Sequence, residues 1–139
     1  MAALRRELYL VSVLVVISIL GQVRGYRGHL VGGRSEVSDV KTNMEVQALG
    51  RFSVEEYSRL QHQHHEEENG DGSRKLTFTE VVEAQRQVVS GIKYYLKVLA
   101  MENEAIKLFK SVVVVKPWVH SKELIHFAPS TAGLELYTN

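Results

Sequence analysis

The chain has 139 residues, of which 45% are hydrophobic and 24% are charged, a composition that suits one globular domain. The formal net charge of +1 leaves no excess of positive charge to neutralise phosphates, so nucleic acid is not an expected partner. The sequence contains no cysteine, which excludes disulfides, thiol nucleophiles and cysteine-based zinc sites.

Residues 1–25 have the layout of a secretory signal peptide. Arg5 and Arg6 precede an apolar run over 8–20, and a small residue follows at Gly25. The run is shorter than the about 20 residues that a membrane span needs. We therefore expect cleavage after Gly25, a secreted protein, and no membrane association once the signal is removed. A retained membrane anchor is the alternative.

Residues 26–42 are rich in glycine and charge and show little periodicity. They predict a flexible lead-in, with a short strand near 38–41.

A helical period begins after this lead-in, with Asn43 as the expected N-cap. Arg51, Glu55 and Arg59 are spaced by four and predict ion pairs on the exposed face. One face of the predicted helix carries Val46, Leu49, Gly50, Ser53, Tyr57 and Leu60. The centre of this face is small, so the helix should approach its neighbour closely.

Residues 61–75 are polar throughout and contain two Asn-Gly or Asp-Gly pairs, which predicts a loop. Its tract 62–68 combines histidines with glutamates, ligands that suit Zn²⁺ or Cu²⁺. No rigid surroundings are expected to orient such ligands. We therefore interpret the tract as a solvated segment, assign no metal site, and keep a metal-binding module as an alternative that calorimetry with Zn²⁺ would test.

Downstream the period becomes two, which predicts β-strands over 76–87, 92–100, 106–115 and 124–127. Glu80 interrupts the first strand, 101–104 form a turn, and Lys116-Pro117-Trp118 interrupt the chain before the last strand. Residues 128–139 form a tail without a pattern. Antiparallel strands joined by tight turns behind one helix predict an α+β domain with the helix across one face of the sheet.

The sequence lacks the motifs of common enzymes. It has no cysteine, no GxSxG, no HExxH and no phosphate-binding glycine loop. Its carboxylates are scattered over faces expected to be solvated. We therefore expect no enzymatic activity and no cofactor.

Two apolar tips are expected at the same end of the sheet. Val88 and Val89 occupy the first hairpin, and Pro117-Trp118 follow two turns later. Exposed apolar groups gathered at one pole usually mark a recognition site, and tryptophan is a frequent interface anchor. The alternative is that the valines fold under the core and that Trp118 is a core residue.

Four ordered motifs resemble those of the plant cystatins, small reversible inhibitors of papain-like cysteine proteases. These motifs are Gly32-Gly33, the helix segment LGRFSV at 49–54 with Glu56 and Tyr57, the Gln-x-Val-x-Gly segment at 87–91, and Pro117-Trp118. The resemblance covers residues 30–127, so we delimit a cystatin-like domain at 26–127. Position 58 is serine where the plant motif usually has asparagine, a difference expected to affect helix hydrogen bonding.

The resemblance implies an antiparallel sheet of four to five strands wrapped around one long helix, and a role in plant defence. It implies that the diglycine and two hairpin loops plug the cleft of a papain-like cysteine protease, as a competitive and reversible inhibitor. The expected protease-binding residues are Gly32, Gly33, Gln87, Val88, Val89, Ser90, Gly91, Pro117 and Trp118. A non-inhibitory binding or storage module with the same fold is the alternative. A domain-swapped dimer, with the first hairpin as hinge, is a further expectation.

Overall fold

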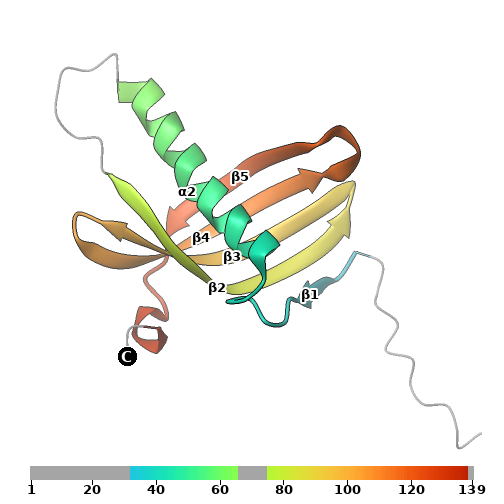
Figure 1. The fold of residues 1–139 in the computed structure, drawn as a ribbon, viewed down its shortest axis with the longest axis horizontal. Helices are drawn as coiled ribbons and strands as arrows, with labels where there is room; N and C mark the ends of the chain where they lie inside the picture. Colours follow the sequence, from blue (N-terminus) through green and yellow to red (C-terminus); the bar gives the residue numbers. More distant parts are fainter. Residues whose placement is uncertain (1–31, 66–74, 138–139) are drawn as a thin grey trace, which may run out of the picture. The chain divides into compact units, whose positions relative to one another are not determined.

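The computed structural model describes residues 32–65 and 75–137. In this part of the chain a helix lies across one face of a five-stranded antiparallel sheet, as predicted (Figure 1). The sheet order is β1-β2-β3-β4-β5, so each strand pairs with the next strand in the chain. The elements are β1 (Arg34–Glu36), α2 (Met44–His65), β2 (Leu76–Val89), β3 (Gly91–Glu102), β4 (Ala105–Lys116), η1 (Pro117–Val119), β5 (Ser121–Pro129) and η2 (Leu134–Leu136).

The predicted signal peptide lies outside the described residues, as does most of the predicted loop. Among the residues that are described, no helix is long and apolar enough to cross a bilayer.

The first strand lies earlier than predicted. β1 pairs with β2 through Arg34 opposite Gln87 and Glu36 opposite Gln85, whereas 38–41 form a turn. In that turn the backbone N–H of Asn43 donates to the carbonyl of Asp39 at 3.0 Å. The prediction of a strand at 38–41 was wrong because the hydrogen bonds of this segment close on themselves and lead the chain into α2.

α2 begins where the sequence predicts and ends later. The Asn43 side chain caps it, since its Oδ1 accepts from the N–H of Val46 at 3.2 Å. The predicted buried face is observed at Val46, Leu49, Gly50 and Ser53. Residues 61–65 are helical rather than part of a loop, because polarity alone does not end a helix and the first strong breaker is the Asn-Gly pair beyond them.

The hydrogen bonds on the outer part of α2 differ from those predicted. Arg59 pairs with Glu56 at 2.6 Å rather than with Glu55, and its hydrogen bond lowers the pKa of the Glu56 carboxyl. The Ser58 hydroxyl donates to the carbonyl of Val54 at 2.9 Å, so it is engaged within the helix.

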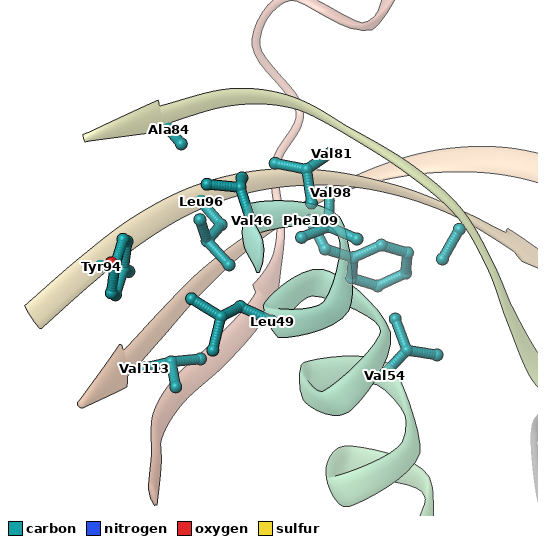
Figure 2. Packing of buried hydrophobic residues seen from close by; sticks show 11 residues of the cluster. Val46, Leu49, Val54, Val81, Ala84, Tyr94, Leu96, Val98, Phe109 and Val113 are labelled. Atoms are coloured by element: carbon teal, nitrogen blue, oxygen red, sulfur yellow. The ribbon is translucent and has the colours of Figure 1, made fainter. Parts of the chain in front are cut away.

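The main core lies between α2 and the sheet (Figure 2). Gly50 allows the close approach, since a Cβ there would lie 2.3 Å from Cγ2 of Val81. Beside it the Ser111 hydroxyl donates to Ser53 Oγ at 2.7 Å, and the Ser53 hydroxyl donates to the carbonyl of Leu49 at 2.9 Å. The buried cluster comprises Val46, Leu49, Val54, Val81, Ala84, Tyr94, Leu96, Val98, Ala100, Phe109 and Val113.

A smaller cluster lies on the opposite face of the sheet. Val82, Leu99 and Leu108 alternate with residues of the main core, so their side chains point away from α2. Register shifts in β2 between Phe78 and Glu80 and between Val81 and Glu83 accompany this change of face.

The chain after β5 covers this outer cluster. Leu134 and Tyr137 pack against it, and the Tyr137 hydroxyl donates to the Glu83 carboxylate. β5 itself is longer than predicted at both ends. The sequence after β5 shows no periodicity that could have revealed the contact of Leu134 and Tyr137 with the outer cluster.

Candidate functional site

The first hairpin carries the two exposed valines. Val88 pairs with Ile92 and Val89 pairs with Gly91, so the turn itself is Ser90. Val88 is 66% exposed and Val89 is 44% exposed. Both side chains therefore lie outside the core, unlike in the alternative in which they fold under it.

Gly91 fixes how the first hairpin meets the end of β4. Its φ is +118°, and a Cβ there would lie 2.8 Å from the backbone oxygen of Val115. Both the backbone conformation and the close approach require glycine at this position.

The second tip is the 3-10 turn η1, which follows β4 directly. Trp118 is 65% exposed, so it is not a core residue, and its neighbour Val119 is 58% exposed. The indole Cη2 lies 3.7 Å from the position of a Cβ on Gly91. The indole therefore lies against the base of the first hairpin, at the same end of the sheet.

The diglycine lies beside β2, on the side of the first hairpin opposite to Trp118. Gly32 and Gly33 are exposed, and Gly32 has a φ of +96°. The Gln87 side-chain amide donates to the carbonyl of Gly32. Strand pairing places Arg34 directly opposite Gln87, so the chain enters the sheet next to the valines.

Tyr95 belongs to the candidate site by its contacts, and the sequence analysis missed it. Its hydroxyl donates to Gln87 Oε1 at 2.9 Å, and the guanidinium carbon of Arg34 lies 3.6 Å from its ring centroid. Tyr95 is two residues from Lys93, the partner of Gln87, so it is a diagonal neighbour on the same face. The signal that could have found it is this register, which requires the hairpin to be built first.

The structure brings all the predicted protease-binding residues to one end of the sheet. We call this set, from the diglycine through the first hairpin to Pro117 and Trp118, the binding edge. Gln87 is half-buried, Gly91 is buried, and the other members are exposed.

The histidine-rich tract shows no metal site in the described residues. His62 and His64 are exposed on the last turns of α2, and no group of histidine and acidic side chains in the described part of the chain could hold a metal ion. The glutamates of the tract lie outside that part.

Comparisons with known proteins identify the family of this chain. A family model described as "SQAPI: Aspartic acid proteinase inhibitor" matches residues 37–130. The chain is 50% identical over 113 residues to Cysteine proteinase inhibitor 4 of Oryza sativa subsp. japonica, an alignment that covers 76% of this chain and 68% of the relative. It is 41% identical over 110 residues to Cysteine proteinase inhibitor 2 of Arabidopsis thaliana, covering 72% and 73%.

Solved structures show the same fold. Dimeric human cystatin F matches with a TM-score of 0.51 at 18% identity, covering 71% of this chain and 86% of that one. A salivary cystatin from the soft tick Ornithodoros moubata matches with a TM-score of 0.52 at 15% identity, covering 71% and 97%.

Proposed function

The chain belongs to the plant cystatins, and from that premise we propose that it is a secreted, reversible and competitive inhibitor of papain-like cysteine proteases. It is a proteinase inhibitor and not an enzyme. The family model carries an aspartic proteinase description, whereas relatives up to 50% identical are named for cysteine proteinases. Such identity to individual relatives supports cysteine proteases as the target class.

One observation carries the binding role: three segments far apart in the sequence converge on one end of the sheet. The side chains of Val88 and Trp118 are more than half exposed there, although both are apolar. Burying such exposed apolar side chains against a partner lowers the free energy and so favours binding. A protease cleft that accepts the binding edge would supply that cover.

The same geometry supports inhibition that needs no covalent step and no cleavage of the inhibitor. β-branched valines have few rotamers to lose, and the tryptophan sits in a short turn, so ordering on binding costs little entropy. The glycines carry no Cβ, which lets the backbone of the diglycine come close to a protease surface. Binding energy then goes into filling the cleft rather than into aligning a peptide bond for attack.

Secretion belongs to the same proposal and rests on the N-terminal sequence. Arginines ahead of a short apolar run and a following small residue are the pattern that a signal peptidase removes. N-terminal sequencing of the protein released by plant cells should begin at Tyr26. A protein retained in the cells with its first residues intact would contradict secretion.

Titration of papain with the purified protein, read with a fluorogenic peptide, tests inhibition. We expect the apparent KM to rise while kcat stays constant, and activity to return on dilution. Pepsin assayed in parallel should be unaffected. If papain is unaffected, the chain is a non-inhibitory member of its fold; if pepsin alone is inhibited, the assignment of protease class is wrong.

A further inference from the structure

Both ends of the Gln87 side chain are already engaged within the protein. Its Nε2 donates to the carbonyl of Gly32, and its Oε1 accepts the hydroxyl hydrogen of Tyr95 at 2.9 Å. The side chain is half-buried, and the strand register places it on the same face of the sheet as Tyr95, opposite to Tyr94, which contacts α2. An amide engaged at both ends in this way is poorly placed to bind a protease.

Tyr95 makes a second attachment through its ring. The Arg34 guanidinium lies over the ring at 3.6 Å, close enough for a cation–π interaction, and the Lys93 ammonium lies at 5.4 Å. Arg34 is the first residue of β1 and follows the diglycine directly. Tyr95 is therefore connected to the diglycine in two ways: by hydrogen bonds through Gln87, and by the ring contact with Arg34.

β1 is held at its two ends by different contacts. Beyond its ladder to β2, the Gln85 side chain donates to the Glu36 carboxylate and the N–H of Val37 donates to the carbonyl of Ala84 at 2.9 Å. The end next to the diglycine is held through Gln87 and Arg34. β1 is three residues long, and it leads from Gly32, whose φ of +96° turns the chain at the edge of the sheet. Ordering such a segment costs conformational entropy, which weakens binding if the cost is met only in the complex. A contact that orders β1 beforehand removes that cost.

We propose that Tyr95 is a positioning residue, which fixes Gln87 and Arg34 and so sets the diglycine beside the valine hairpin before a protease arrives. Gln87 then acts as a tether within the inhibitor and not as a protease contact. The proposal deepens the proposed function and rests on it for its effect on affinity.

Tyr95→Phe tests the hydroxyl while keeping the ring beneath Arg34. Loss of one hydrogen bond of this kind should raise the papain inhibition constant about fivefold. In a Gln87→Leu background the same change should have no further effect, because the acceptor is gone. Backbone amides of β1 should exchange with deuterium faster in Tyr95→Phe than in the native protein.

Tyr94→Phe is the matched control. Tyr94 is the preceding residue of the same strand, and its hydroxyl donates to Glu45 of α2 at 3.2 Å on the other face of the sheet. It should leave both the inhibition constant and exchange in β1 unchanged.

Two outcomes overturn the proposal: unchanged exchange in β1 on Tyr95→Phe, or an equal and independent loss of inhibition on Tyr95→Phe in the Gln87→Leu background. Exchange does not depend on a protease. If the native protein fails to inhibit papain and exchange still rises in Tyr95→Phe, the positioning role of Tyr95 is supported and the proposed function is wrong.

Discussion

Single residues at the binding edge divide into those that face water and those that hold the edge together. Trp118 belongs to the first kind, being 65% exposed, whereas Gly91 belongs to the second, since it is buried against β4. Substitutions of the two should therefore be distinguishable. One should affect affinity alone, and the other should also affect the free energy of unfolding.

Trp118→Ala should raise the papain inhibition constant about thirtyfold, because loss of an anchor tryptophan typically costs about 2 kcal/mol. The melting temperature should hardly change, since the indole is not part of the core. Ile106→Ala, at an exposed apolar residue in the hairpin between β3 and β4, is the control and should leave inhibition intact. A melting temperature lowered by several degrees in Trp118→Ala would place the indole among the structural residues.

Gly91→Ala should lower the free energy of unfolding by about 1–3 kcal/mol, because φ is positive and the new Cβ would meet the Val115 oxygen. Denaturant unfolding measures the change. Ser90→Ala, at the exposed neighbour, should be close to neutral. Equal stability of the two variants would mean that the hairpin tolerates a Cβ at position 91.

The pH dependence of stability should show the contribution of Tyr94. Burial, and then the nearby Glu45 carboxylate, raise the pKa of its phenol. Between the unfolded pKa of about 10 and the higher folded pKa, the native state holds the proton more tightly, so the free energy of unfolding falls as pH rises. Tyr94→Phe should flatten this alkaline decline in a urea titration series, and an unchanged slope would contradict the assignment.

At the scale of elements, the contact between α2 and β2 determines how the sheet fits the helix. Gly50 faces Val81 and Phe78, which flank the first register shift of β2. A small residue on the helix and an irregular strand opposite it are therefore two parts of one contact. The sequence analysis identified the small residue and the interruption of the strand at Glu80, but not that the two face each other.

Gly50→Ala should destabilise the protein although alanine is the better helix former. Helix propensity favours alanine by about 1 kcal/mol. Against this, a Cβ 2.3 Å from the buried Val81 side chain overpacks the core, at a cost of about 1–3 kcal/mol or more. Thermal unfolding measures the net loss, and Glu55→Ala on the exposed face is the neutral control. A stabilised Gly50→Ala variant would show that β2 moves to accommodate the new Cβ.

The periodic elements could be predicted from the sequence, and the shortest ones could not. The alternation of Ile92, Leu96 and Val98 defines β3 without any knowledge of its partners. β1 has too few residues to show a period, and its position is set by pairing with β2. Tyr95 likewise becomes a site residue only through the register of the hairpin.

At the scale of the whole domain, the binding edge and the outer cluster occupy different parts of the sheet. The binding edge gathers at the end where β2 meets β3 and where β4 meets β5. The outer cluster under η2 lies on the face away from α2 and includes no residue of the binding edge. Changes to that cluster should therefore alter stability without altering inhibition.

Leu134→Ala should lower the melting temperature by about 5 °C, as expected for about 1 kcal/mol of lost burial in a domain of this size. The papain inhibition constant should stay unchanged at room temperature. Leu136→Ala is a matched control in the same turn, because Leu136 is 78% exposed. Equal melting temperatures for both variants would mean that η2 adds nothing to the domain.

The pairing of β1 with β2 affects where the domain begins to unfold. Glu36 and Gln85 are 49 positions apart in the chain, and the ladder that joins their strands is three residues long. Closing so long a loop costs entropy that so short a ladder barely repays, so β1 should fray before any other strand. Under the proposed function, an inhibitor that loses this leading segment should bind its protease through the two hairpins alone, and more weakly.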